Sequence, residues 1–182
     1  MTFQIIKTKV IDSTSRRVGR QFSENVEKLY NLAAIKTTGA NFVYYLTDRL
    51  QTQIKKSTIN DSYRNVVIIL TDGYLELSMP NKQKRSISPE ALDLNRFCTD
   101  GNAAIFTYPT NTLGLTYKNC EIYLLEFNEK KSGEGCHFKA LQQWWTNWIK
   151  TMEFSNVNNG FIFRKRAATD LTKKDVQGIF GL

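Results

Sequence analysis

The stretch NVVIILTDGYLEL occupies residues 65–77 of this 182-residue chain. Its central part is a run of five aliphatic residues, 66–70, which leads directly into Thr71, Asp72 and Gly73. A strand that is apolar at every position needs cover on both faces, and this is typical of a central parallel strand in an α/β sheet. Ligands of such sheets bind beyond the carboxyl ends of the strands. We therefore expect Asp72 to stand at the mouth of a binding site.

Strand and helix patterns alternate along the rest of the chain. Apolar runs and apolar residues spaced by three and four predict strands at 3–11, 103–108 and 120–127, and helices at 22–34, 42–54 and 137–152. This alternation predicts an α/β fold with a doubly wound, mostly parallel sheet flanked by helices. We expect one domain over residues 1–182, with an exposed loop at 80–89 and a basic C-terminal extension at 155–182.

The cysteine content is low and odd. The chain has three cysteines, Cys98, Cys120 and Cys136, and no C-x-x-C pair, which argues against a disulfide framework and against a structural zinc site. This usage is typical of a reducing compartment, so we predict a cytoplasmic protein. No window approaches the run of about 18 apolar residues that a membrane helix needs, so no membrane partner is expected.

The net charge of +8 is concentrated at the two ends of the chain. Residues 1–60 carry ten basic and four acidic residues, 61–128 carry six and eight, and 129–182 carry nine and five, which gives +6, −2 and +4. Basic surfaces attract polyanions without reading their sequence. Nucleic-acid binding through the basic ends is therefore one alternative function.

Two chemical roles suit Asp72. It can accept backbone N–H bonds and cap the turn after the strand, or it can help to hold a hard cation such as Mg²⁺. The run VVIILTDGYLEL (66–77) resembles the central strand and T-D-G turn of von Willebrand factor type A domains. Those domains are doubly wound α/β folds that commonly bind partners through a metal-ion-dependent adhesion site. The resemblance implies a Mg²⁺ site that includes Asp72.

A second loop of that adhesion site contributes a threonine ahead of a helix. The segment KTTGANFVYYL (36–46) resembles this loop, because a threonine and a glycine open an amphipathic helix that leads to the Asp72 strand. The resemblance implies Thr38 as the preferred ligand, Thr37 as its close rival and Gly39 as the turn residue.

The first loop of the adhesion site is matched only in part. The family pattern D-x-S-x-S aligns Asp12 and Thr14 with two ligand positions, but its last position falls on Arg16, which cannot coordinate a cation. Either the chain has a compact, degenerate version of the site, or 3–11 is a later strand and the first strand lies upstream. The lysines of 3–11 are typical of an edge strand and favour the second explanation. Both predict weak Mg²⁺ binding that depends on Asp72.

Enzymatic alternatives have less support in the sequence. A metal-dependent hydrolase centred on Asp72 is conceivable because Glu76 supplies a second carboxylate four residues on. Cys136 and His137 are neighbours in sequence, but a nucleophile and its base must meet in space, which adjacency does not provide. No phosphate-binding glycine motif occurs.

The tryptophan cluster of helix 137–152 raises the question of base stacking. Trp145 and Trp148 share a helix face with other apolar residues, so we expect them in the core. Trp144 lies beside that face and is expected to be partly exposed. The cluster therefore predicts packing against a sheet, not a nucleic-acid platform.

The sequence as a whole predicts a non-enzymatic module that binds another protein at the carboxyl ends of its strands. Nucleic-acid binding and metal-dependent hydrolysis remain the two alternatives. The expected site residues form two groups: Mg²⁺ ligands at Asp72, Thr38, Asp12 and Thr14, and partner-binding residues at Gly73, Tyr74, Thr37 and Gly39.

Overall fold

The computed structural model describes residues 24, 42–59, 63–78, 84–86, 88–89, 91–110, 113–128, 135–167 and 169–180. The predicted strand 3–11 and all of the predicted helix 22–34 except Glu24 lie outside these ranges. Five of the expected site residues also lie outside them: Asp12, Thr14, Thr37, Thr38 and Gly39.

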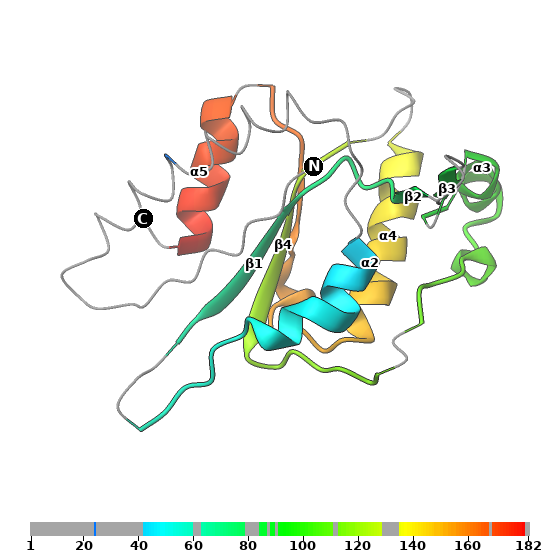
Figure 1. Cartoon of the computed structure of the whole chain (residues 1–182). Helices are drawn as coiled ribbons and strands as arrows, with labels where there is room; N and C mark the ends of the chain where they lie inside the picture. Colours follow the sequence, from blue (N-terminus) through cyan, green and yellow to red (C-terminus); the bar gives the residue numbers. More distant parts are fainter. Residues whose placement is uncertain are drawn as a thin grey trace.

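Three parallel strands form the main sheet: β1 (Asn65–Leu70), β4 (Cys120–Phe127) and β5 (Ile162–Arg164). Their order is β1-β4-β5, so β4 is the middle strand (Figure 1). The predicted strands 66–70 and 120–127 are confirmed, and so is a mixed α/β fold with a parallel sheet. Among the described residues β1 pairs with β4 alone. A second neighbour for β1 and the doubly wound arrangement therefore stay predictions.

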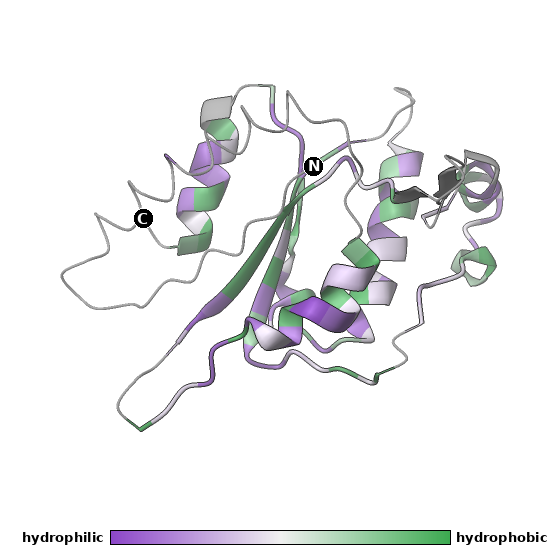
Figure 2. Ribbon diagram, in the orientation of Figure 1, coloured by the Kyte–Doolittle hydropathy of each residue, from purple (hydrophilic) through white to green (hydrophobic). Residues whose placement is uncertain are grey.

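Helices cover both faces of this sheet (Figure 1). The helix α5 (Thr169–Phe180) packs on one face, where Val176 and Ile179 share an apolar cluster with Val66 and Leu125. The opposite face is covered by α4 (Cys136–Lys150) and by a helical segment near residues 42–52. Figure 2 shows β1 hydrophobic along most of its length, as expected for a strand covered on both faces.

The predicted helix 42–54 is helical over residues 42–52. It consists of α2 (Phe42–Tyr44), a π turn η1 (Tyr45–Arg49) and a 3₁₀ turn η2 (Leu50–Thr52). Phe42, Leu46 and Leu50 are buried because their spacing of four places them on one helix face. This segment therefore closes the core in front of β1 and β4.

The predicted helix 137–152 is confirmed as α4. Trp145 and Trp148 are fully buried, which excludes them as exposed stacking platforms. The prediction for Trp144 is wrong, because this side chain is also 0% exposed. Its indole Nε1 donates a hydrogen bond to the carbonyl oxygen of Thr107 at 2.7 Å, and its ring stacks against Tyr108. The loop that contains Thr107 and Tyr108 thus covers Trp144, which the periodicity of the helix alone does not place in the core.

Residues 76–100 make an excursion between β1 and β4. The antiparallel hairpin of β2 (Glu76–Ser78) and β3 (Lys84–Ser86) leads to α3 (Ala91–Asp100). The predicted exposed loop 80–89 is thus wrong at residues 84–86, which pair as a strand, and at Ser88 and Pro89, which are buried. In Figure 1 this excursion lies beside α4, on the side away from α5.

The predicted strand 103–108 is also wrong. Residues 103–105 form the 3₁₀ turn η3 (Ala103–Ile105), which begins where Asn102 Oδ1 accepts the backbone N–H of Ala104 at 2.9 Å. A side-chain oxygen that bonds two residues ahead favours a turn over strand pairing. Phe106 is then buried, and its ring stacks on Phe97 of α3.

A disulfide joins Cys98 in α3 to Cys136 at the start of α4, 38 residues further along the chain. This bond corrects the argument from the cysteine count against disulfides. Cys120 is the free and buried member of the three. Structural disulfides are typical of oxidising compartments. The cysteine argument for a cytoplasmic location therefore loses its support, and that location stays a prediction.

The segment 155–182, expected as a basic extension, contributes β5 and α5 to this fold. Before β5, the loop 155–161, which includes the 3₁₀ turn η4 (Val157–Asn159), runs along the edge of β4. Ser155 N–H donates to the carbonyl of Cys120, and the buried Asn156 amide bonds both the N–H and the carbonyl of Ile122, at 2.9 and 2.8 Å. In the part of the chain that the structure describes, no helix is long and apolar enough to cross a membrane.

Candidate functional site

The turn after β1 stands at the carboxyl end of the sheet. Thr71 is buried, its N–H donates to the carbonyl of Leu125 at 3.0 Å, and its Oγ1 accepts the N–H of Gly73. The side chain of Asp72 is exposed, and its Oδ1 accepts the N–H of Tyr74 at 3.1 Å. Asp72 therefore caps the turn, which is one of the two roles that its sequence position suggested.

Gly73 is required by the close packing beneath this turn. Its φ of +94° is a conformation that residues with a side chain rarely adopt, and a Cβ there would lie 2.6 Å from the ring of Phe127. Its carbonyl oxygen accepts a hydrogen bond from Trp145 Nε1 at 2.8 Å. Gly73 is itself buried, so it supports the turn from below and is not a surface that a partner can touch.

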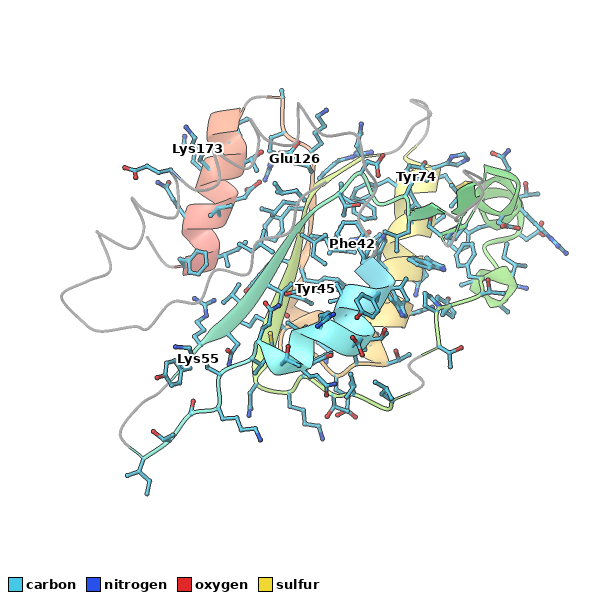
Figure 3. All side chains as sticks on the ribbon, viewed as in Figure 1. Phe42, Tyr45, Lys55, Tyr74, Glu126 and Lys173 are labelled. Atoms are coloured by element: carbon cyan, nitrogen blue, oxygen red, sulfur yellow. A yellow bond between two sulfur atoms is a disulfide. The ribbon has the colours of Figure 1, made fainter. Side chains whose placement is uncertain are left out.

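The neighbouring strand ends extend the same surface. The N–H of Asn128, after β4, donates to the carbonyl of Asp72 at 3.2 Å. Tyr74 is half-buried, and Figure 3 shows it beyond the end of β1, near the start of α4. The described site residues Asp72 and Tyr74 thus lie together at this end of the sheet.

A basic group stands at the end of β5. Arg164 and Lys165 are exposed, and the N–H of Lys165 donates to the carbonyl of Phe127 at 2.9 Å. The Arg164 guanidinium lies 4.4 Å from the ring centre of Phe138, in the first turn of α4. Since β4 lies between β1 and β5, the backbones of Asp72 and Arg164 are separated by two strand spacings, or about 10 Å. In the sequence, Arg164 and Lys165 are recognisable only as part of a run of charged residues, because no local pattern links them to Asp72.

The end of β4 carries a conformational irregularity. Glu126 has a φ of +63°, and the register of β4 with β5 shifts between Leu124 and Phe127. Its Oε1 accepts a hydrogen bond from the hydroxyl of Thr172 in α5 at 2.6 Å. A non-glycine residue in this region costs about 1–3 kcal/mol and is held only where its surroundings fix it. Figure 3 shows Glu126 on the side of the sheet that faces α5.

The described residues contain no group of three or more His, Cys, Asp or Glu side chains close enough to hold a metal ion such as Mg²⁺. Asp72 supplies one exposed carboxylate, of which Oδ1 already accepts a backbone N–H. The other expected ligands, Asp12, Thr14 and Thr38, lie outside the described residues. Asp72 alone does not make a Mg²⁺ site.

The adjacent pair Cys136 and His137 is otherwise engaged. The Cys136 sulfur is bonded to Cys98, and His137 Nε2 lies 2.8 Å from the amide oxygen of Asn95. In the disulfide form Cys136 cannot act as a thiolate nucleophile.

The strongest pKa shifts lie away from the turn and have structural causes. Burial raises the pKa of Tyr117 to about 12 and the pKa of the Cys120 thiol to about 12, and it raises the pKa of Tyr45 further. At the amino ends of the strands, the hydrogen bonds from Arg64 lower the pKa of Glu121. These shifts follow from packing and from ion pairing.

Comparison of the chain with protein-family models, with curated proteins and with solved structures finds no match. The resemblance to von Willebrand factor type A domains therefore depends on the residues of the Asp72 strand and turn and on the 36–46 segment.

Proposed function

We propose that this chain is a non-enzymatic protein-interaction module, similar to von Willebrand factor type A domains, that docks a partner protein at the carboxyl ends of β1, β4 and β5. The observation that carries the proposal is the combination of an exposed Asp72 side chain with a backbone that several hydrogen bonds hold. The turn presents a charge to solvent from a rigid support. A partner that binds there immobilises little of this chain, which lowers the entropic cost of association.

Three groups around the turn hold it in place. Hydrogen bonds from Trp145 to Gly73 and from Asn128 to Asp72 fix the main chain on two sides. Immediately after the turn, Leu75 N–H donates to the hydroxyl of the buried Ser88 at 2.9 Å. The exposed atoms of the turn thus stand on a support that packing holds in place.

The charges of this surface indicate the kind of partner. Asp72 is acidic and follows β1. Arg164 and Lys165 are basic and exposed at the end of β5, on the other side of β4. A partner that presents a basic group to Asp72 and an acidic group to Arg164 or Lys165 complements both charges. Mg²⁺ bound through Asp72 remains part of the proposal, with Asp12, Thr14 and Thr38 as its further ligands.

The exposed basic residues also support the alternative of weak nucleic-acid binding. Stacking on the tryptophans does not contribute to it, since all three are 0% exposed. Phosphate binding by such residues falls steeply as salt is raised. A salt series with single-stranded DNA therefore separates this alternative from protein docking.

The proposal is tested by position-specific crosslinking in an extract of the source cells. A photoreactive phenylalanine replaces Tyr74 in one sample and Leu113 in another, because Leu113 is 58% exposed and lies before the amino end of β4. We expect one discrete adduct at position 74 and none at position 113. The adduct at 74 should disappear when unlabelled wild-type protein competes.

Two variants of Asp72 separate charge from turn capping. Asp72→Asn keeps an oxygen that accepts the Tyr74 N–H but loses the charge, whereas Asp72→Ala loses both. We expect both variants to compete poorly, since the charge is what the partner reads. Competition by Asp72→Asn equal to that by wild type, or equal adducts at positions 74 and 113, contradicts the proposal. Loss of the adduct in EDTA and its return with Mg²⁺ decides the metal component.

A further inference from the structure

The disulfide between Cys98 and Cys136 fastens α3 to the start of α4. The two Cα atoms are 5.8 Å apart, and Cys136 is the first residue of α4. The hairpin and α3 that precede this bond continue directly from the Asp72 turn. The bond therefore closes the excursion 76–100 onto the body of the protein.

The rest of α3 is attached by modest contacts. Of the side chains that the structure describes on α3, at 93–100, Leu94 alone is buried. The ring of Phe97 stacks on Phe106 with centroids 5.4 Å apart, and Asn95 meets His137. A helix of ten residues is marginal by itself in water, so it depends on such tertiary contacts.

The two sulfurs of the bond differ in their surroundings. Cys98 is exposed, whereas Cys136 is half-buried. Cys120 is 1% exposed and its pKa is raised by burial, so it stays an unreactive thiol in the folded protein. A thiol in solution therefore meets Cys98 first.

We propose that Cys98 is a thiol-exchange site, at which a low-molecular-weight thiol opens the Cys98–Cys136 disulfide and releases α3 from α4. The thiolate attacks Cys98 Sγ, forms a mixed disulfide there and breaks the bond to Cys136 Sγ. The electron pair leaves on Cys136 as a thiolate. A second thiol then attacks the mixed disulfide and frees Cys98, so that two thiols are oxidised to one disulfide and the protein gains two thiols.

The position of Cys136 favours this direction of cleavage. It is the first residue of α4, and Gly135 before it provides no side-chain cap. The unpaired N–H groups and the dipole of a helix N-terminus stabilise a thiolate, which makes Cys136 the better leaving group. The exposure of Cys98 favours attack at its sulfur, and the helix position of Cys136 favours its departure as a thiolate. Both features therefore favour the same direction of cleavage.

The consequence of opening is local. Without the bond, the described contacts that hold α3 are the burial of Leu94, the stacking of Phe97 and the contact of Asn95, so local opening of this helix costs less free energy. The main sheet consists of β1, β4 and β5, and its cysteine, Cys120, is buried and is not part of the bond. We expect α3 to open while the sheet stays folded, which makes α3 a redox-dependent element. This inference does not rest on the proposed function.

The test exposes the full-length native protein to graded mixtures of reduced and oxidised glutathione and then quenches it with acid. Peptide mapping should find the glutathione adduct at Cys98 at intermediate ratios, with none at Cys120. Hydrogen exchange of residues 91–100 should become about tenfold faster or more in the reduced protein, while exchange of β4 stays unchanged. Oxidation should reverse both changes.

Single-cysteine variants provide the controls. In Cys136→Ser, oxidised glutathione should trap a stable adduct at Cys98. Cys120→Ser should behave as wild type. The proposal is overturned by a disulfide that glutathione leaves intact, by adducts that form first at Cys136, or by exchange that rises equally in α3 and β4. If a variant does not fold, the wild-type series alone decides.

Discussion

The guanidinium of Arg64 and the carboxylate of Glu121 form a two-point ion pair, with Nε–Oε1 and Nη2–Oε2 distances of 2.7 Å each. The hydroxyl of Tyr123 donates to the same carboxylate at 2.6 Å, and Arg64 also donates to the carbonyl of Ile179 in α5. The pair therefore ties α5 to the amino ends of β1 and β4. It lies at the opposite end of the sheet from Asp72.

The ion pair predicts a specific acid sensitivity. Hydrogen bonds from Arg64 lower the pKa of Glu121 in the folded protein, so the stabilisation is fully present above the unfolded pKa, about 4.3. It is lost as the pH falls through the folded pKa. Arg64→Ala should lower the free energy of unfolding by about 1–2 kcal/mol at pH 7, since the pair is partly exposed. Urea unfolding between pH 7 and pH 3 should show a smaller acid dependence in this variant.

A matched control is available at the pair of Arg166 and Asp175, which has similar two-point geometry. Arg166→Ala should destabilise the protein less than Arg64→Ala, because Arg166 is more exposed than Arg64, and Arg64 also bonds the carbonyl of Ile179. Equal losses in the two variants would show that the network around Glu121 has no special role.

Gly73 should not tolerate a side chain. Gly73→Ala combines an unfavourable φ with a methyl group 2.6 Å from the buried ring of Phe127, and we expect a loss of about 3 kcal/mol. Gly114→Ala is the control, since its φ is also positive but nothing lies within 4 Å of its Cβ. The free energy of unfolding of the Gly114→Ala variant should fall by about 1 kcal/mol. Thermal or urea unfolding measures the stability of the two variants. Equal destabilisation would show that the contact with Phe127 does not contribute.

The indole N–H groups of Trp145 and Trp148 differ in a way that mutation can measure. Trp145 Nε1 donates to the carbonyl of Gly73, whereas Trp148 Nε1 has no hydrogen-bond partner among the described residues. Trp145→Phe should therefore lower the free energy of unfolding by about 1–2 kcal/mol more than Trp148→Phe, because it leaves the buried carbonyl of Gly73 without this hydrogen bond. Trp148→Ala should cost about 3–5 kcal/mol, as large core truncations do. Urea unfolding of the three variants tests this order, and a larger cost for Trp148→Phe would contradict it.

Long periodic segments were predictable from sequence because their pattern alone determines which residues are buried. The eight residues of β4 and the apolar face of α4 were predicted within two residues of their observed ends. The turn role of Asp72 was one of two stated interpretations, since an aspartate followed by glycine after a strand has a local hydrogen bond to make.

Features that depend on distant contacts were not predictable in the same way. The burial of Trp144 requires Thr107 and Tyr108, which periodicity in α4 does not reveal. The disulfide joins residues that are 38 apart, so only the packing of α3 on α4 identifies the pair. The Arg164 and Lys165 surface next to Asp72 likewise arises from the order of the strands.

Asn156 offers a test of the loop beside β4. Asn156→Ala removes both bonds to Ile122 and leaves a buried N–H and a buried carbonyl without partners, so we expect a loss of about 2–4 kcal/mol. Asn156→Asp keeps the acceptor and loses the donor, and its carboxylate faces the carbonyl of Ile122 at neutral pH. It should be at least as unstable at pH 7 and recover part of the loss when the carboxyl group is protonated. Unfolding by urea at pH 7 and pH 4 measures both, and a variant as stable as wild type would contradict this role.

The same loop covers part of one edge of β4. An uncovered strand edge offers a row of N–H and carbonyl groups on which another chain can add a strand, and this is a common route to aggregation. Between Cys120 and Leu124 of β4, groups of this kind are already bonded by Ser155, Asn156 and Phe161, through irregular backbone and two side chains. A loop of this kind satisfies the edge without presenting a new edge of its own. We therefore expect this loop, which contacts the sheet far from the Asp72 turn, to hinder the addition of a strand from another copy along this part of β4.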